Sequence, residues 1–256
     1  MIFVIDVGNT NITIGIYKEK SLIDTFRLMT ATPRTSDEYG MLLYDICKRS
    51  NINPDEDVEG AIVASVVPNV MHSIKNAIGK YLKCRALIVG PGIKTGIKID
   101  TPNPKEIGAD RIVDIVAGYE KYGGPLLVID FGTATTYDLV TSDGRFTVGI
   151  TALGLGTSAK ALSGGTAMLP DFEIVMPKSV LANETIWSMQ AGLLYGQIGA
   201  TEYIINQVRK ETGYDDLKVV ATGGMGRLVA NETKLIDEYD KNLTLEGLRI
   251  IYEKNR

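Results

Sequence analysis

Few of the residues that build disulfide frameworks, zinc sites or histidine-based active sites occur in this sequence. Its 256 residues include two cysteines and one histidine. Cys47 and Cys84 are too few and too far apart for a disulfide framework or a zinc site, so we expect buried, reduced thiols. The single histidine, His72, excludes every mechanism that needs two histidine side chains.

The chain is also poor in positive charge and in long apolar segments. Its net charge is −4 and its sequence pI is about 5.2, which argues against a nucleic-acid-binding surface. No segment approaches the ~20 consecutive apolar residues of a membrane span. The opening residues form a strand-like run without the basic region and cleavage site of a signal peptide. We therefore expect a cytoplasmic protein that has neither a nucleic-acid partner nor a membrane partner.

Hydrophobic residues make up 45% of the chain, enough for the core of one large domain or two small ones. Strand-like runs such as residues 60–65 alternate with segments in which apolar residues recur at helical spacing. The longest helical pattern covers residues 185–212, and its wide apolar face suits either a domain core or a subunit interface. This alternation predicts an α/β fold. Helices are predicted at 36–50, from Pro68, and at 112–122, 154–163, 185–212 and 243–255.

The same unusual order of residues occurs twice. An apolar run ends in Asp6, with Gly8 two residues later, and another ends in Asp130, followed in the same way by Gly132. Each turn leads into a second strand, a polar turn and a third strand. Taken alone, either turn could be an ordinary hairpin. A repeat this long indicates two related domains, whose turns would offer carboxylates and phosphate-cradling groups for Mg-ATP between two lobes.

Two further segments suggest ligand contacts. Asp110 and Arg111 begin the helix predicted at 112–122. A helix-capping acid is a sufficient explanation for Asp110, whereas a cation at that end opposes the helix dipole and points to an anionic ligand. A third glycine turn, residues 222–226, would let the backbone approach a flat ligand, although a simple strand-to-helix connection needs the same residues.

Seven motifs, in this order along nearly the whole chain, resemble those of type III pantothenate kinases. That family belongs to the superfamily of sugar kinases, acetate kinase, actin and Hsp70 ATPase domains. The resemblance implies an α/β protein with two related lobes of the actin-like ATPase (ribonuclease H-like) fold and an interlobe ATP cleft. We expect an N-terminal lobe over residues 1–115 and a C-terminal lobe over 116–256. The motifs are DVGNTN (6–11), ASVVP (64–68), NPKEIGADR (103–111), DFGTATTYD (130–138), SMQAGLLYG (188–196), ATGG (221–224) and LTLEGL (243–248).

The resemblance implies ATP-dependent phosphorylation of pantothenate to 4′-phosphopantothenate, the first step of coenzyme A biosynthesis. It also implies ATP with Mg²⁺, a monovalent cation (K⁺ or NH₄⁺), and a homodimer for which the helix at 185–212 is a plausible interface. Phosphoryl transfer needs positioning and charge neutralisation more than covalent chemistry, and the residue types in these motifs suit that need.

Carried over residue by residue, the resemblance assigns three carboxylates. Asp110 would be the base that accepts the proton of the substrate hydroxyl, Asp130 would hold the monovalent cation, and Asp6 would lie near Mg²⁺. Arg111 would bind the carboxylate of pantothenate, since arginine binds carboxylates through two parallel hydrogen bonds. The implied ATP-binding residues are Asp6, Val7, Gly8, Asn9, Thr10, Asn11, Ile12, Thr13, Gly132 and Thr133. The implied substrate-binding residues are Gly108, Ala109, Asp110, Arg111 and Thr185.

Departures from the family pattern lie outside the proposed metal, phosphate and base residues, and four of them bear on the substrate. Val148 stands where a glycine is usual, and Leu153 where a proline is usual. Glu184 places a carboxylate where an amide is expected, and Thr101 replaces a tyrosine of the substrate loop. These departures bear on substrate affinity more than on nucleotide binding.

Two alternatives to a pantothenate kinase remain at the level of sequence. One is a kinase of the same fold with a shifted substrate, in which the departures would be the change in specificity. The other is a nucleotide-binding regulatory paralogue of the transcriptional accessory factor type. Asp110 and Arg111 discriminate against the second, because a pure ATP sensor would need neither. Fold alone does not separate these alternatives, so the site residues decide between them.

Overall fold

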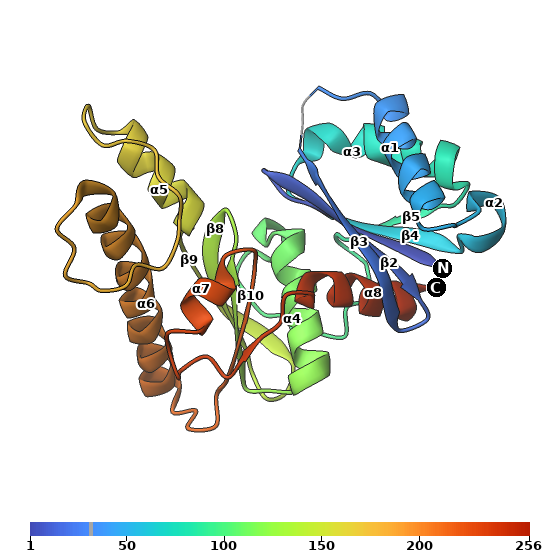
Figure 1. Ribbon diagram of the computed structural model, residues 1–256. Helices are drawn as coiled ribbons and strands as arrows, with labels where there is room; N and C mark the ends of the chain where they lie inside the picture. Colours follow the sequence, from blue (N-terminus) through green and yellow to red (C-terminus); the bar gives the residue numbers. More distant parts are fainter. Residues whose placement is uncertain (31–32) are drawn as a thin grey trace. The chain divides into compact units, whose positions relative to one another are not determined.

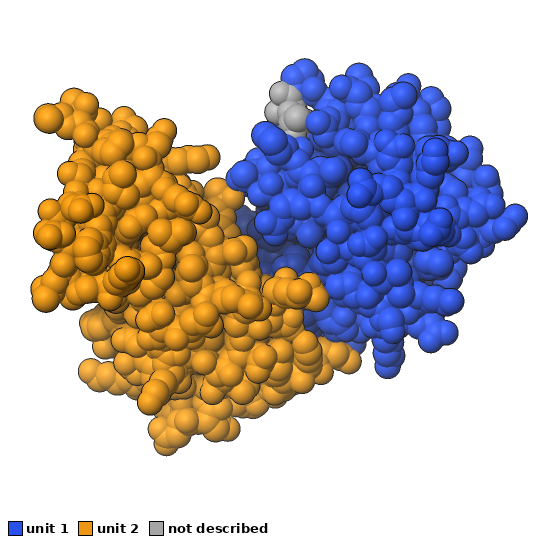
Figure 2. All heavy atoms as spheres, viewed as in Figure 1, with its two compact units in different colours: residues 1–97, 102–117, 243–256 blue, residues 98–101, 118–242 orange. Residues whose placement is uncertain are grey.

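The computed structural model describes residues 1–30 and 33–256, and its contacts divide the chain into two compact units (Figures 1 and 2). Unit 1 comprises residues 1–97, 102–117 and 243–256. Unit 2 comprises residues 98–101 and 118–242. Each unit is built on one β-sheet with helices packed against it. None of the described helices has the length and apolar character of a membrane span.

Unit 1 contains a five-stranded sheet with the strand order β3-β2-β1-β4-β5. Strands β1, β2 and β3 form antiparallel pairs, while β4 and β5 continue the sheet in parallel with β1. Its elements are β1 (Ile2–Val7), β2 (Asn11–Lys18), β3 (Ser21–Met29), α1 (Ser36–Arg49), α2 (Pro54–Asp57), β4 (Gly60–Ser65), α3 (Pro68–Ala77), the π-helix η1 (Ile78–Leu82), β5 (Ala86–Ile88), the 3₁₀ helix η2 (Pro104–Glu106), the first part of α4 (Ala109–Tyr122), and α8 (Leu243–Asn255).

Helices cover both faces of the sheet in unit 1. One face packs against α1 and α3, with Leu43 and Ile74 in the shared core (Figure 1). The opposite face packs against α8 and the first part of α4, with Leu248 and Val113 in the shared core. Because both faces are covered, the central strands β1 and β4 consist of nearly continuous apolar residues. Unit 1 therefore has three layers, with the sheet in the middle.

Unit 2 contains a six-stranded sheet with the strand order β11-β10-β7-β8-β9-β6. Strands β7, β8 and β9 form antiparallel pairs, β10 and β11 continue in parallel with β7, and β6 pairs in parallel with β9. The elements of unit 2 are β6 (Lys98–Ile99), the last turn of α4, β7 (Leu126–Phe131), β8 (Ala134–Val140), β9 (Arg145–Leu153), α5 (Leu155–Gly164), α6 (Thr185–Thr212), β10 (Lys218–Thr222), α7 (Gly226–Ala230) and β11 (Glu238–Tyr239).

The two sheets repeat the same topology. Read outward from the third strand, β9-β8-β7-β10-β11 in unit 2 matches β3-β2-β1-β4-β5 in unit 1, strand for strand and in the same relative directions. The carboxylates of the two repeated turns occupy equivalent places: Asp6 is the last residue but one of the central strand β1, and Asp130 is the last residue but one of the central strand β7. The predicted α/β class with two related halves is confirmed.

Helix α6 spans residues 185–212, as its apolar pattern predicts. One side contributes residues such as Leu194 to the core that includes Phe131 of β7. Two large apolar side chains of the helix stay exposed, Ile186 at 45% and Tyr203 at 66%. Most of the wide apolar face seen in the sequence is therefore at least partly buried within unit 2.

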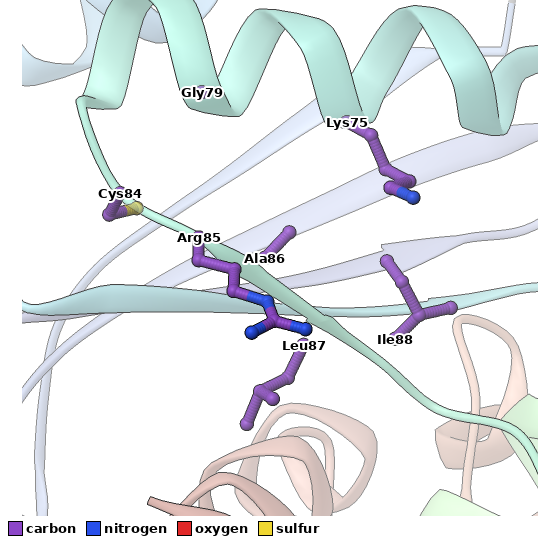
Figure 3. A pocket seen from close by; sticks show the side chains of 7 residues that line it. All are labelled: Lys75, Gly79, Cys84, Arg85, Ala86, Leu87 and Ile88. Atoms are coloured by element: carbon purple, nitrogen blue, oxygen red, sulfur yellow. The ribbon is translucent and has the colours of Figure 1, made fainter.

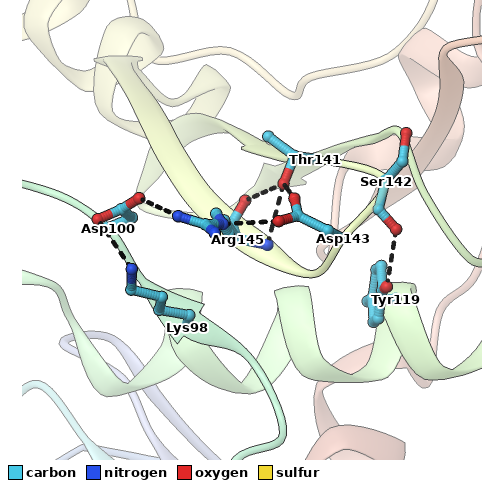
Figure 4. A network of polar contacts seen from close by, with 7 residues as sticks. All are labelled: Lys98, Asp100, Tyr119, Thr141, Ser142, Asp143 and Arg145. Atoms are coloured by element: carbon cyan, nitrogen blue, oxygen red, sulfur yellow. Dashed lines mark hydrogen bonds and ion pairs between the residues drawn. The ribbon is translucent and has the colours of Figure 1, made fainter.

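The two-residue strand β6 is an element that the sequence pattern does not predict. It pairs in parallel with the first residues of β9, and Figure 4 shows the polar network around this pairing. The guanidinium of Arg145 donates to Asp143 at 2.6 Å and to Asp100 at 3.3 Å, and Lys98 lies 3.7 Å from Asp100. These groups are exposed, and such pairs contribute only about 0–1 kcal/mol each. The short strand thus depends on backbone pairing with a distant segment.

Helix α8 packs with unit 1, where Leu245 and Leu248 share a core with Val4. The domain limits predicted from the sequence, 1–115 and 116–256, assign this helix to the C-terminal lobe. Those limits stay a prediction of the domain organisation, and the compact units differ from them chiefly in this helix.

Candidate active site

The first repeated turn is held by backbone and hydroxyl hydrogen bonds. The amide of Gly8 donates to the carbonyl of Asn11 at 3.0 Å. From the end of β3, Thr30 donates its hydroxyl to the carbonyl of Gly8 at 2.7 Å and its amide to the carbonyl of Thr10 at 3.0 Å. Residues 6–13, predicted from the sequence as a phosphate loop, thus form the end of β1, a braced turn and the start of β2.

Asp6 occupies a central position at the edge of the sheet in unit 1. It lies opposite Thr13 of β2 and beside Ala64 of β4, and its side chain is half-buried. Strands β1 and β4 are parallel, so their carboxyl ends meet at one edge of the sheet. Ligands of open α/β sheets bind outside the carboxyl ends of such strands.

Residues 108–111 reach the same edge of unit 1. The backbone amide of Val66, just beyond β4, donates to the carbonyl of Val7 at 3.1 Å. A Cβ placed on Gly108 would lie 3.5 Å from a side-chain carbon of Val66 and 2.4 Å from Oδ1 of Asp110. Glycine is needed there because the Asp110 carboxylate folds back over it. Val66 therefore connects the first turn to the start of α4, and the structure brings these two predicted segments together.

Asp110 is the second residue of α4. Its Oδ1 accepts a hydrogen bond from the backbone amide of Arg111 at 2.8 Å, so the carboxylate satisfies one of the amides that every helix start leaves without a partner. The carboxylate also lies where the positive end of the helix dipole favours negative charge. Asp110 and Arg111 are both half-buried.

The second repeated turn is braced in a similar way within unit 2. The amide of Gly132 donates to the carbonyl of Ala134 at 3.1 Å. The carbonyl of Thr133 accepts from the amide of Gly154 at 3.2 Å and from the hydroxyl of Thr157 at 2.6 Å. The exposed Thr133 side chain therefore projects from a turn whose backbone is held by the start of α5.

Gly223, in the third glycine turn, lies directly against Asp130. Its φ of +92° is in the region that side chains rarely adopt, and a Cβ there would lie 2.4 Å from Oδ1 of Asp130 and 2.6 Å from the backbone of Phe131. The hydroxyl of Tyr239 donates to the carbonyl of Gly223 at 2.9 Å and holds the turn in this position. The sequence pattern marks the glycine turn, but its contact with Asp130 comes from the pairing of β10 with β7.

Thr185 lies in unit 2, whereas residues 108–111 lie in unit 1, so the predicted substrate residues are divided between the units. Thr185 is the first residue of α6 and is exposed. It lines a hollow of about 540 Å³ within unit 2. Glu184 and Ser188 line the same hollow, so the carboxylate that departs from the family pattern lies beside Thr185.

The departures on β9 do not crowd the interior of unit 2. Val148 is 43% exposed and Leu153 is 61% exposed. Their larger side chains therefore project from the surface of the strand, and neither fills space that the unit needs for its own packing.

No group of three or more His, Cys, Asp or Glu side chains gathers as a metal site among the residues that the structure describes. Mg²⁺ in nucleotide sites is held through one or two carboxylates together with phosphate oxygens and water. A single carboxylate at each turn, Asp6 and Asp130, therefore suits a cation that shares its coordination with a bound nucleotide.

The sequence profile described as Type III pantothenate kinase matches residues 2–207. A curated type III pantothenate kinase from Agathobacter rectalis is 58% identical over 254 residues, covering 99% of this chain and 97% of that protein. The chain belongs to the type III pantothenate kinase family. Membership makes it a kinase.

Two solved structures extend the likeness to the level of the fold. A "putative Baf family transcriptional activator" from Campylobacter jejuni has a TM-score of 0.57 and 19% identity, covering 99% of this chain and 98% of that chain. A "putative N-acetylglucosamine kinase" from Porphyromonas gingivalis has a TM-score of 0.51 and 15% identity, covering 100% of this chain and 99% of that chain. At such identities the likeness shows the fold alone, that of the actin-like ATPases and sugar kinases.

Proposed function

We propose that this member of the type III pantothenate kinase family transfers the γ-phosphoryl group of ATP to the 4′ hydroxyl of pantothenate. The product, 4′-phosphopantothenate, is the first intermediate of coenzyme A biosynthesis. The observation that carries this proposal is the position of Asp110, which shares one edge of the unit 1 sheet with the first phosphate turn. A carboxylate near the phosphates and near the substrate hydroxyl is what this transfer requires. We place the reaction in the cytoplasm, where thiols stay reduced.

In this proposal the two turns hold ATP. Backbone amides and hydroxyls of residues 6–13 contact phosphate oxygens, as successive amides in a tight turn do. Asp6 holds Mg²⁺ together with those oxygens. Gly132 and Thr133 contribute the corresponding contacts from unit 2. Bound Mg²⁺ neutralises charge that develops on the transferring phosphoryl group.

Asp130 holds a monovalent cation, K⁺ or NH₄⁺, in this proposal. Its support is the rigid setting of the carboxylate at the end of β7, where the glycine turn at Gly223 packs against it. A cation at Asp130 offsets the negative charge that the carboxylate would otherwise direct at the phosphates.

The substrate side of the proposal rests on the start of α4. Oδ1 of Asp110 is engaged by the amide of Arg111, which orients the carboxylate and leaves Oδ2 to accept the proton of the pantothenate hydroxyl. Arg111 binds the pantothenate carboxylate. Gly108 and Ala109 form the backbone of this binding segment, and Thr185 contributes from α6.

The first test of the function measures ADP release by the purified chain with MgATP, KCl and pantothenate. We expect release that depends on pantothenate, because water is a poor substitute for a positioned hydroxyl. The control is the same mixture without pantothenate. ATP binding with no pantothenate-dependent release would contradict the proposal and favour the regulatory or shifted-substrate alternative.

Replacing KCl by NaCl at equal ionic strength is expected to lower the rate about tenfold or more, an effect of at least about 1.4 kcal/mol on the barrier. The reason is the proposed cation at Asp130, whose site would suit the larger ions K⁺ and NH₄⁺. Steady-state rates with KCl, NH₄Cl and NaCl check this, with NH₄Cl expected to support activity. Equal rates in KCl and NaCl would refute the cation assignment.

We further propose a homodimer whose interface includes the exposed Tyr203 of α6. Light scattering of the eluted protein is expected to give about 56 kDa, twice the 27.8 kDa of the chain. Tyr203→Glu should shift the mass toward the monomer, because it places a charge in an apolar contact. Tyr44→Glu is the matched control, since Tyr44 is 53% exposed on α1. A wild-type monomer, or a dimer unaffected by Tyr203→Glu, would disprove this interface.

A further inference from the structure

A hollow within unit 1 lies at the open edge of its sheet, apart from every residue assigned to the reaction. Strand β5 is the last strand on that side, and the hollow lies between it and the helices α3 and η1 (Figure 3). It has a volume of about 430 Å³, within the size range of small-molecule sites. Its lining residues are Lys75, Gly79, Cys84, Arg85, Ala86, Leu87 and Ile88.

Two cationic side chains line this hollow from different elements. Lys75 comes from the last turn of α3 and Arg85 from the residue before β5; in Figure 3 the Lys75 side chain points from the helix toward the strand, and the Arg85 side chain runs along the strand. Among the described residues, neither the Lys75 nor the Arg85 side chain has an ion pair or a hydrogen bond, whereas the neighbouring Lys80 pairs with Asp37 at 2.8 Å. None of the lining residues is acidic. The two charges are thus available to an anion.

The surrounding sequence strengthens this positive character. Residues 60–99 contain no aspartate or glutamate, in a chain that has 31 acidic residues and a net charge of −4. A local excess of one charge sign raises the local concentration of ions of the opposite sign. The basic residues in the stretch are Lys75, Lys80, Lys83, Arg85, Lys94 and Lys98.

The strand side of the hollow is apolar and neutral. Ala86 and Ile88 of β5 face the helices α3 and η1, Leu87 points to the opposite face of the sheet, and all three are partly exposed. Burial raises the pKa of the Cys84 thiol to about 11, so this side chain carries no charge at neutral pH. The hollow therefore combines two cations with a short apolar wall.

We propose that this hollow binds a small organic phosphate. The phosphate group contacts Lys75 and Arg85, and a short carbon chain packs against Ala86 and Ile88 of β5. A phosphate monoester carries nearly two negative charges at pH 7, which matches two cations, and the arginine fork binds phosphate through two parallel hydrogen bonds. The volume of the hollow and its two cations match a small phosphate monoester in size and charge.

The test uses n-butyl phosphate with the full chain, in the presence of saturating MgADP so that the nucleotide site is filled. Binding is followed by the rate at which iodoacetamide alkylates Cys84 at pH 9, measured by peptide mass spectrometry. We expect n-butyl phosphate to slow alkylation of Cys84 in a saturable way. Inorganic phosphate should need about tenfold higher concentration, because it lacks the apolar chain. Cys47, which is fully buried, is the internal control.

Variants separate this hollow from any other phosphate site. Lys75→Gln and Arg85→Gln are each expected to raise the half-saturating concentration of n-butyl phosphate about tenfold. Gly79→Leu should block binding, since a Cβ there meets no atom within 4 Å and the side chain has open space to fill. Lys20→Gln, an exposed lysine in the turn between β2 and β3, should leave binding unchanged.

Two outcomes would overturn the proposal. One is Cys84 alkylation that n-butyl phosphate does not slow in the wild-type chain. The other is protection that persists undiminished in both Lys75→Gln and Arg85→Gln, because the phosphate would then lie elsewhere. Activity with MgATP and pantothenate is not the readout, so failure here leaves the proposed kinase reaction untouched.

Discussion

Asp110→Asn is expected to lower kcat by about 10²- to 10⁴-fold, the usual contribution of a positioned general base. Asparagine keeps an oxygen in the place of Oδ1, so the hydrogen bond from the amide of Arg111 and the start of α4 should survive. What is lost is the negative oxygen that accepts the hydroxyl proton. The measurement is steady-state kcat, together with ATP affinity from thermal shift.

ATP affinity should stay within about twofold of wild type, because Asp110 contacts the acceptor rather than the nucleotide in this scheme. Asp45→Asn is the matched control, since Asp45 is an exposed carboxylate on α1. Near-normal turnover of Asp110→Asn would remove this residue as the base and leave its carboxylate as a helix cap.

Gly223→Ala is expected to lower kcat/KM for ATP about 100-fold or more and to reduce the free energy of unfolding by about 1–3 kcal/mol. The added Cβ would lie 2.4 Å from Oδ1 of Asp130 and 2.6 Å from the backbone of Phe131. Either the glycine turn or the carboxylate must move. Displacing Asp130 disturbs the proposed cation site and the turn at Thr133 together. ATP titrations in KCl and a denaturant unfolding curve check both parts.

Gly213→Ala separates backbone strain from this contact. Gly213 also has a positive φ, +72°, but a Cβ there meets no atom within 4 Å. Gly213→Ala should therefore lower the free energy of unfolding without lowering kcat/KM for ATP. If Gly213→Ala and Gly223→Ala affect ATP kinetics equally, the contact between Gly223 and Asp130 has no role in the site.

The departures from the family pattern at Val148, Leu153 and Glu184 differ in where they lie relative to the proposed substrate residues. The first two side chains are largely exposed on β9, so unit 2 accommodates them without repacking. Glu184 lines the same hollow as Thr185, where its charge would oppose an anionic substrate. Of these three departures, Glu184 is therefore the one whose position ties it to the proposed substrate residues.

The sequence alone determined the elements that depend on neighbouring residues. The residues Thr35 and Glu38 indicate a helix start, and in the structure they form the reciprocal capping box of α1. The apolar spacing over 185–212 predicts α6 with its observed bounds. The repeated order of an apolar run, Asp and Gly predicts two related sheets, because each turn belongs to a strand pair that is continuous in the chain.

Only the tertiary structure decided the features that depend on segments far apart in the chain. The two-residue strands β6 and β11 exist because they pair with distant strands, and no local pattern marks so short an element. The amphipathic pattern of α8 does not say which sheet the helix covers. Its packing beside Val4 of β1 places it in unit 1. Gly223 meets Asp130 because β10 pairs in parallel with β7. Hydrophobic periodicity is a local property of the chain, whereas these contacts follow from which strands and helices bury one another's faces.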